Sequence, residues 1–186
     1  MAVPAVQAFG YGYLQGADAA AKELGVDVSV LYHYTGDFAE TDQNKATAKT
    51  MYQQGTELIF ACGGSVGKSV MSAAAEADAK TIGVDVDQRY DSETVVTSAV
   101  KGLGASVMAV LESIKDGTFD TYAAKTTYFD ATNDGVGLPT VVLDGSSDNA
   151  FDRFNTFTKA DYDAVFTKLV DGSVDPVREI DLAAED

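Results

Sequence analysis

Apolar runs and helical patterns alternate along the first half of the chain. Three apolar runs are each followed by small or acidic residues, and they cover residues 27–34, 57–61 and 81–84. Continuous runs of this kind, separated by amphipathic helices, are typical of parallel strands buried on both faces. The pattern predicts an α/β fold with a doubly wound parallel sheet. Because ligands of open sheets bind at the carboxyl ends of the strands, we expect a crevice near Phe38, Gly63, Gly64 and Asp85.

The predicted helices begin and end at recognisable signals. They cover residues 6–24, 41–54, 66–79, 100–117 and 158–170. Gly25 and Gly55 follow two of them, because glycine adopts the left-handed conformation that ends a helix. Thr158 and Asp161 form a capping box at the start of the last helix. Further strands are expected at residues 94–100, 125–129 and 177–180, with a long loop around Pro139.

Two of these helices carry apolar stripes. The stripe of the helix at 100–117 is the most regular in the chain and consists of Val100, Leu103, Val107, Val110, Leu111 and Ile114. Such stripes usually lie in the core, so we expect this face of the helix to pack there. A binding site for a partner is the second interpretation. The last helix is expected to bury Tyr162, Val165, Phe166, Leu169 and Val170.

Charge restricts the partners of the chain. It has 29 acidic residues against 13 Lys and Arg, a net charge of −16 and a pI near 4.2. This field repels polyanions, so nucleic acid and anionic membrane surfaces are poor partners. No apolar run is long enough for a membrane helix, and no basic region followed by an apolar stretch opens the chain. We therefore expect the chain itself to be soluble, without a signal or lipobox.

Cysteine and histidine offer little chemistry. The single Cys62 excludes an internal disulfide, and His33 has no second histidine or cysteine nearby for a local zinc site. We interpret Cys62 as a small hydrophobic residue at the end of a strand and His33 as a strand residue bonded to backbone or water. The sequence predicts neither a metal nor a cofactor.

Two glycine patterns resemble nucleotide-binding motifs but lack required parts. Residues 62–69 lie where a phosphate-binding loop would be, yet Cys62 occupies the position of the first glycine. Three glycines between residues 10 and 16 have dinucleotide-fingerprint spacing without the strand that must precede it, and close helix packing explains them better. Gly63 and Gly64 still allow backbone N–H groups to approach a ligand at a helix N-terminus.

Four side chains are candidates for ligand contacts. Asp85 and Asp87 point to the same side of an extended chain. A carboxylate there holds a sugar diol through bonds worth about 1.5–3 kcal/mol, or else caps a turn. Phe38 either fills the core below its polar loop or stacks on a planar ligand, and Lys101 reaches into the crevice or lies on the surface. No nucleophile or metal cluster is fixed nearby, so an enzyme is not expected.

Several sequence elements together resemble one known family. They are residues 4–6 with Phe9, Tyr13 and Gly16, residues 34–38, Gly55 before residues 57–60, Gly63-Gly64, residues 82–88 and residues 97–101. In this order they resemble the basic membrane protein family, bacterial substrate-binding lipoproteins of ABC importers that are also called purine nucleoside receptors. The likeness runs from Met1 to about Lys168. Its most specific part is Gly-Val-Asp-x-Asp-Gln, residues 83–88.

The resemblance implies a type I periplasmic-binding-protein-like fold, in which two α/β lobes joined by a hinge close on the ligand. Residues 1–99 and 121–186 would form the second lobe, and residues 100–120 a helix that packs with the first lobe. In the family, a complete first lobe and the first strand of the second lobe precede the position matched by Met1. We therefore expect unpaired strand edges and an uncovered apolar stripe, and with them association with another copy through the exposed lobe face, or residues 2–6 used as a strand.

The resemblance also implies roles for individual residues. An aromatic residue matching Phe38 stacks on the base, and two glycines line the cleft. An aspartate matching Asp85 holds the ribose, and a lysine matching Lys101 adds polar contacts. The predicted ligand-binding residues are Phe38, Gly63, Gly64, Asp85, Asp87 and Lys101.

The resemblance implies the substrate-binding component of an ABC importer. This component would bind a nucleoside in a cleft between two lobes, and a purine nucleoside is the first candidate. The intact protein would be an extracytoplasmic, membrane-anchored lipoprotein with an ABC permease as its partner. The alternatives are a cytoplasmic small-molecule sensor or regulator with the same fold, and a receptor for a sugar or an autoinducer.

Overall fold

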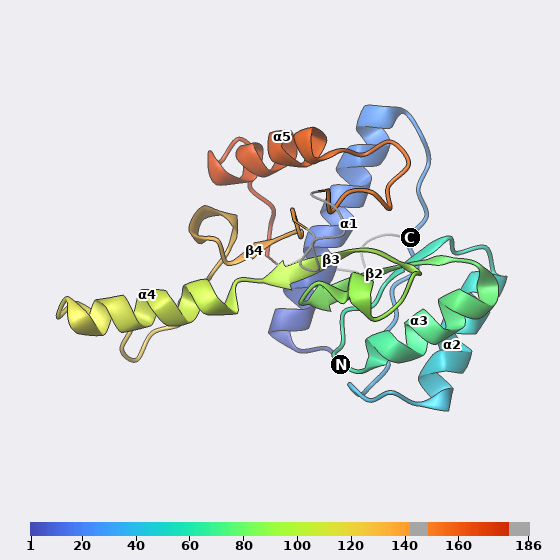
Figure 1. Ribbon diagram of the computed structural model, residues 1–186, viewed down its shortest axis with the longest axis horizontal. Coiled ribbons are helices and arrows are strands. Elements are labelled where there is room, and N and C mark those ends of the chain that lie inside the picture. Colours follow the sequence, from blue (N-terminus) through green and yellow to red (C-terminus); the bar gives the residue numbers. More distant parts are fainter. Residues whose placement is uncertain (142–148, 179–186) are drawn as a thin grey trace.

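The computed structural model describes residues 1–141 and 149–178. Figure 1 shows the helices and strands, which are α1 (Pro4–Leu24), α2 (Asp42–Gln53), β1 (Leu58–Phe60), α3 (Val66–Ala77), β2 (Lys80–Asp85), β3 (Val95–Lys101), α4 (Leu103–Lys115), β4 (Val136–Gly137) and α5 (Lys159–Val170). Three short 3-10 turns complete them: η1 (Gln88–Tyr90), η2 (Phe119–Thr121) and η3 (Ala131–Asn133).

The sheet has the strand order β1-β2-β3-β4. The first three strands are parallel, with Ile59 opposite Thr81 and Gly83 opposite Ser98. The short β4 runs antiparallel to β3. The parallel α/β sheet that the apolar runs predict is thus confirmed, whereas β4, which is only two residues long, lies in a region predicted as a loop.

Side chains from helices pack on both faces of β1. On one face, Ala61 belongs to the core cluster that α2 and α3 form, and Ile59 packs against that cluster. On the other face, the ring centroid of Phe60 lies 5.3 Å from that of Tyr13 and 6.5 Å from that of Phe9, both in α1. Successive side chains of a strand point to opposite faces, so β1 carries one apolar layer on each side.

Local signals define the helix ends as predicted. Gly25 ends α1 with a φ of 67°, in the left-handed region. The Thr41 hydroxyl accepts a hydrogen bond from the Asn44 N–H at 3.1 Å at the start of α2. Thr158 and Asp161 form the predicted capping box at the start of α5. These boundaries depend on contacts within a few residues, which a sequence pattern can reveal.

The strand predicted at residues 27–34 is wrong. The segment forms no ladder, and among the described residues no backbone–backbone hydrogen bond joins it to another segment. A strand needs a neighbour about 4.8 Å away, and here a hollow separates the segment from β1. The apolar run is therefore present without the partner that would make it a strand.

Two other strand predictions also fail. Residues 125–129 are irregular, because β4 already occupies the outer edge of β3 at Val100 and Lys101. Residues 2–6 do not form a strand, because α1 begins at Pro4, and proline suits the first turn of a helix. Val177 and Arg178 are irregular, and the rest of the strand predicted at 177–180 lies outside the described residues.

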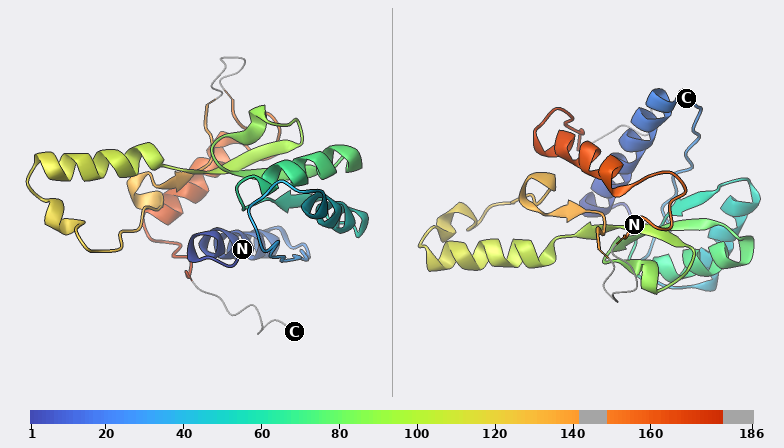
Figure 2. Two further views of the ribbon diagram at one scale, coloured as in Figure 1. Left: turned by 90° about the horizontal axis from the view of Figure 1, so that it is seen from below. Right: turned by 45° about the horizontal axis from the view of Figure 1, so that its top comes forward.

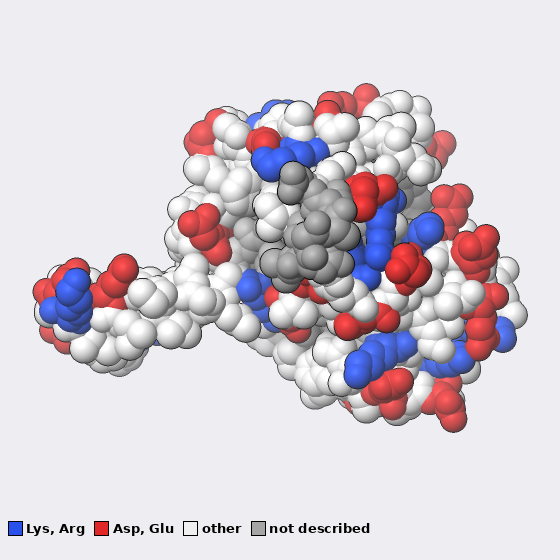
Figure 3. All heavy atoms as spheres, in the orientation of Figure 1, with Lys and Arg blue, Asp and Glu red and all other residues white. Residues whose placement is uncertain are grey.

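The prediction that the stripe on α4 packs in the core is wrong. Leu103, Val107, Leu111 and Ile114 are each more than half exposed. In two views α4 projects away from the sheet (Figures 1 and 2), and its charged side chains gather at the far end (Figure 3). This agrees with the uncovered stripe that the family resemblance implies.

In the part of the chain that the structure describes, no helix is both long and apolar enough to cross a bilayer.

Aromatic side chains around α5 form a second packed group, in which Phe151 is buried. Its rings are those of Phe151, Phe154, Phe157, Tyr162 and Phe166. Within α5, Tyr162, Phe166 and Leu169 are half-buried, whereas Val165 and Val170 are exposed, so the predicted apolar face is buried only in part.

Candidate functional site

The carboxyl ends of β2 and β3 bring Asp85 and Lys101 together. The Nζ of Lys101 lies 2.5 Å from Oδ1 of Asp85 and 5.2 Å from the centre of the Phe9 ring. Both charged side chains keep more than a third of their surface exposed. The two residues are the last of adjacent parallel strands, which explains why a pair so far apart in sequence meets at one edge.

The backbone of Asp85 is strained. Its φ is 72°, in the left-handed region that non-glycine residues adopt rarely. Its Oδ1 is shielded from solvent and makes no hydrogen bond of ordinary geometry within the described residues, so Lys101 is its ionic partner. Strain of this kind persists only where the surroundings fix it, and it is concentrated at functional sites.

A small hydrogen-bond network fixes the turn at Asp85. Oε1 of Gln88 accepts a bond from the Val84 N–H at 2.9 Å, and the Gln88 N–H donates to the Ser98 hydroxyl at 3.0 Å. A Cβ at Gly83 would lie 2.6 Å from the Ser98 hydroxyl oxygen and 2.8 Å from the Gln88 Oε1. Gly83, Gln88 and Ser98 are thus positioning residues. Gly83 and Gln88 are the first and last residues of the Gly-Val-Asp-x-Asp-Gln element, but the sequence alone did not predict this role for them.

Asp87 is turned to a different partner. Its carboxylate receives bonds from the Arg89 Nε at 2.9 Å and Nη2 at 2.6 Å, and both side chains are almost fully buried. This contact raises the pKa of the Arg89 guanidinium. Arg89 also donates to the carbonyl of Ala150 at 2.8 Å. Asp87 is close to Asp85 in sequence, but its carboxylate oxygens bind Arg89 and so hold the loop.

Phe38 lies against the two glycines that follow β1. A methyl group added at Gly63 would lie 3.9 Å from the Phe38 Cδ1, and one at Gly64 would lie 3.8 Å from its Cβ. Phe38 is 40% exposed, so it covers the glycines and also offers surface to a ligand. Its loop is fixed by the buried Asn44, whose amide donates to the Asp37 carboxylate and the Ala39 carbonyl, each at 2.9 Å.

A hollow of about 230 Å³ lies beside Asp85, and of the six predicted ligand-binding residues only Gly64 and Asp85 line it. Its lining consists of Gly64, Ser65, Lys68, Val84, Asp85, Val86 and Gln88. Helix α3 begins there without a side-chain cap. Its first three N–H groups donate instead to the backbone carbonyls of residues 63–65, at 3.1–3.3 Å. The hollow thus offers the carboxylate of Asp85 and the ammonium group of Lys68. Within residues 1–141 and 149–178, no cluster of acidic, histidine or cysteine side chains could hold a metal ion.

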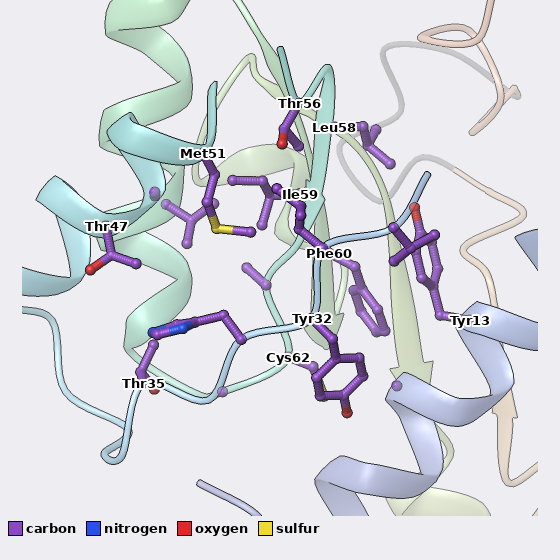
Figure 4. A pocket seen from close by; sticks show the side chains of 18 of the residues that line it. Tyr13, Tyr32, Thr35, Thr47, Met51, Thr56, Leu58, Ile59, Phe60 and Cys62 are labelled. Atoms are coloured by element: carbon purple, nitrogen blue, oxygen red, sulfur yellow. The ribbon is translucent and has the colours of Figure 1, made fainter. Parts of the chain in front are cut away.

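A larger hollow of about 710 Å³ lies on the other side of β1 (Figure 4). Cys62 contributes to its lining, and burial raises the pKa of this thiol to about 11. A thiol with so high a pKa is almost entirely protonated near neutral pH and is a poor nucleophile. This fits the prediction that Cys62 acts as a small hydrophobic residue.

Comparison with known proteins identifies relatives. The profile of the Bmp family, described as "ABC transporter substrate-binding protein PnrA-like", matches residues 1–167. Basic membrane protein D of Borreliella burgdorferi is 34% identical over 137 residues, which are 72% of this chain and 38% of that protein. The "ABC transporter nucleoside-binding protein BmpA" of Lactococcus lactis is 32% identical over 148 residues, 70% of this chain and 40% of that protein. The chain therefore spans well under half the length of these relatives.

Solved structures show the same fold. An ABC transporter solute-binding protein of Aeropyrum pernix superposes with a TM-score of 0.74 at 21% identity, over 98% of this chain and 57% of that one. A solute-binding protein of Conexibacter woesei gives 0.67 at 25% identity, over 95% of this chain and 54% of that one. These neighbours have the type I periplasmic-binding fold. The chain belongs to the Bmp family of PnrA-like ABC transporter substrate-binding proteins.

Proposed function

We propose that this chain binds a nucleoside as the ribose-holding part of the substrate-binding protein of an ABC importer. The observation that carries the proposal is the strained Asp85, paired with Lys101 at the joint carboxyl ends of parallel strands. A relative with 32% identity is described as nucleoside-binding, which supports this class of ligand.

Each group at the site has a task in this function. The Asp85 carboxylate accepts hydrogen bonds from the two ribose hydroxyls, each worth about 1.5–3 kcal/mol as a charge-assisted bond. Lys101 pairs with that carboxylate and adds a donor of its own. Gly63 and Gly64 let the ligand approach the backbone, and Phe38 stacks on the base for about 1–3 kcal/mol. Asp87 contributes indirectly, because its bonds to Arg89 hold the loop after Asp85.

The complete site is a cleft in this proposal. The described hollow is its wall on the second lobe, and the first lobe that the family resemblance implies supplies the opposite wall. Closure would exclude water and strengthen the polar contacts to the ribose. Because this chain supplies only part of these contacts, we expect it alone to bind nucleosides weakly.

Two further relatives bear on where the intact protein acts. Two Pyrococcus relatives, each 28% identical, are described as uncharacterized lipoproteins. We infer that the intact protein is an extracytoplasmic lipoprotein that delivers its ligand to an ABC permease, and that it catalyses no reaction.

The regulator alternative has less support. A structure described as a transcriptional activator of the comK gene from Bacillus halodurans superposes with a TM-score of 0.60, but at 14% identity this likeness concerns the fold alone. The family profile covers residues 1–167 and favours transport. A sugar in place of the nucleoside is tested by titration with ribose.

The test is an amide-resolved NMR titration of the chain with adenosine, guanosine, ribose and a dideoxy nucleoside that lacks both ribose hydroxyls. We expect both nucleosides to shift the amide signals of Gly63, Gly64 and Asp85, and the dideoxy analogue to have little effect. Asp85→Asn should abolish the response. The matched control is Asp78→Asn, since Asp78 is exposed, has a φ of 52° and lies at the opposite end of α3.

Equal shifts with the nucleoside and its dideoxy analogue would refute the role of Asp85. Larger shifts with ribose than with either nucleoside would favour the sugar alternative and remove the role of Phe38. Micromolar or tighter binding by this chain would contradict the expected need for a second lobe.

A further inference from the structure

The loop of residues 35–40, which carries Phe38, has no support from its own backbone. Within the described residues, none of its N–H or C=O groups takes part in a backbone–backbone hydrogen bond. Gly36 has a φ of 84°, a conformation that glycine adopts easily. Because no helix or strand ladder fixes this loop, the place of Phe38 depends on hydrogen bonds from side chains.

Asp37 determines the shape of the loop. Its Oδ1 accepts a hydrogen bond from the Ala39 N–H at 3.0 Å, as in turns closed by an aspartate. The Thr35 hydroxyl donates to the Asp37 carbonyl at 2.9 Å. These two bonds join residues of the loop only to one another. They therefore fold the loop around Phe38 but do not attach it to the rest of the molecule.

Asn44 attaches the loop to α2. It lies in the first turn of that helix and is only 5% exposed. Its Nδ2 donates both to the Asp37 Oδ1 and to the Ala39 carbonyl, each at 2.9 Å. These two acceptors belong to the residues directly before and after Phe38. One buried amide group thus holds both neighbours of the aromatic residue.

Ser69 attaches the end of the loop to α3. The Thr41 N–H donates to the Ser69 hydroxyl at 3.0 Å, and that hydroxyl donates to the Thr41 carbonyl at 3.0 Å. Ser69 is buried. The glycines against which Phe38 lies, Gly63 and Gly64, come just before the start of the same helix. The loop and the surface below Phe38 are therefore both fixed to α3.

The other half of the site is held by different residues. Gln88 and Ser98 fix the turn at Asp85, and neither of them bonds to the Phe38 loop in the described part of the chain. A residue that orders Phe38 in advance lowers the cost of ordering the loop when a base binds. Such a residue would affect the affinity for a base without affecting the affinity for a sugar at Asp85.

We propose that Asn44 is a positioning residue that sets the preference of this site for nucleosides over free sugars, because it holds Phe38 in place beside Gly63 and Gly64. This inference rests on the proposed function, in which Phe38 stacks on the base. Without the two Asn44 bonds, the loop spends less time in the conformation that binds the base. The apparent affinity for a nucleoside falls in the same proportion.

Three variants and a control separate this role from a general effect on folding. Asn44→Ala removes the donor. Asp37→Ala removes the acceptor from an exposed position, where a substitution leaves the core intact. Asp37→Asn keeps an amide oxygen that accepts the same bonds, so it should behave like the unsubstituted chain. The matched control is Gln43→Ala, because Gln43 is the exposed neighbour of Asn44 in the same helix turn.

The first measurement needs no ligand. The Phe38 ring shifts the NMR signals of nearby groups, so the amide signals of Gly63 and Gly64 report its position. In Asn44→Ala and Asp37→Ala, we expect these signals to move toward their positions in Phe38→Leu, which lacks the ring. In Asp37→Asn and in the control they should stay in place.

The second measurement is the ratio of the ribose Kd to the adenosine Kd, taken from titrations that follow the Asp85 amide signal. Phe38→Leu should lower this ratio about fivefold or more, through loss of stacking. Asn44→Ala and Asp37→Ala should lower it about threefold or more, with the ribose Kd unchanged. Because Asn44 acts through Phe38, adding Asn44→Ala to Phe38→Leu should lower the ratio no further.

Unchanged Gly63 and Gly64 signals in Asn44→Ala would overturn the inference and leave the proposed function intact. The same holds if Phe38→Leu lowers the Kd ratio and Asn44→Ala does not. A further loss when Asn44→Ala is added to Phe38→Leu would show that Asn44 acts through another residue, and would also overturn the inference. An unchanged ratio in Phe38→Leu itself would instead refute stacking in the proposed function, and the inference with it.

Discussion

At the scale of single residues, the site depends on a backbone that is held in an unfavourable conformation. Asp85 has a φ of 72° because Gln88 and Ser98 fix the turn around it. The apolar runs predicted that Asp85 lies at the crevice, because they locate strand ends, whereas Lys101 was assigned to the site only through the family resemblance. The sequence could not reveal the ion pair of Asp85 with Lys101, which are distant in sequence, or that Arg89, the nearby partner of Asp87, is held by the distant carbonyl of Ala150.

The strain at Asp85 predicts opposite effects of two substitutions. Asp85→Gly removes a left-handed conformation that costs about 1–3 kcal/mol and an exposed ion pair worth about 0–1 kcal/mol. The free energy of unfolding in urea should therefore stay the same or rise by about 1 kcal/mol, while the nucleoside response is lost. Asp85→Val, with a β-branched residue at the same φ, should be clearly destabilising. Equal unfolding free energies for the two variants would mean that the conformation is not strained.

The raised pKa of Cys62 predicts a pH dependence of its reactivity. Because the pKa of the thiol is higher in the folded chain, the neutral thiol stabilises the fold. This stabilisation is complete below about pH 8.5, the ordinary thiol pKa. It is lost as the pH rises toward 11. In the native chain, the rate of alkylation by iodoacetamide should still be rising at pH values where the urea-unfolded chain has reached its plateau. A native rate that levels off at the same pH as the unfolded rate would contradict the buried position of the thiol.

At the scale of elements, helices were easier to predict than strands. The ends of α1, α2 and α5 depend on nearby residues such as Gly25, Thr41 and Thr158, and the sequence located all three. A strand depends on a partner that the local pattern does not contain. Residues 27–34 have a strand-like apolar run, but no strand within the described part of the chain pairs with them. The short β4 pairs with β3 although its own pattern is too short to predict it.

The glycines of α1 test how that helix packs. A Cβ at Gly10 would lie 2.1 Å from the Tyr32 hydroxyl oxygen, whereas one at Gly12 would have nothing within 4 Å. Gly10→Ala should therefore be destabilising by about 1–3 kcal/mol through overpacking, and the matched Gly12→Ala should stabilise by about 1 kcal/mol through helix propensity. Urea unfolding of both variants measures the difference. Two equal gains in stability would show that Tyr32 does not pack on α1.

At the scale of the whole molecule, the exposed stripe of α4 is the feature that the sequence placed incorrectly. Its spacing is that of a core helix, but spacing cannot show whether a covering element exists. In the structure α4 projects from the sheet with its apolar residues in solvent (Figure 1). Large exposed apolar faces of this kind mark interaction surfaces.

We therefore still expect this chain to associate with another copy through the exposed lobe face. Sedimentation equilibrium should show concentration-dependent dimers, and the double substitution Val107→Glu with Leu111→Glu should shift them to monomers, because burying two carboxylates in an apolar contact is costly. Lys115→Glu at the far end of the same helix is the control and should have a small effect. A compact monomer at all concentrations, with unchanged behaviour of the double variant, would contradict this expectation.

The most direct test of the account is a crystal structure of the chain soaked with a saturating concentration of adenosine. We predict that both ribose hydroxyls donate to the Asp85 carboxylate at about 2.5–2.7 Å, with the base against Phe38. A nucleoside bound elsewhere, or one that turns its ribose to solvent and leaves the Asp85–Lys101 pair untouched, would contradict it.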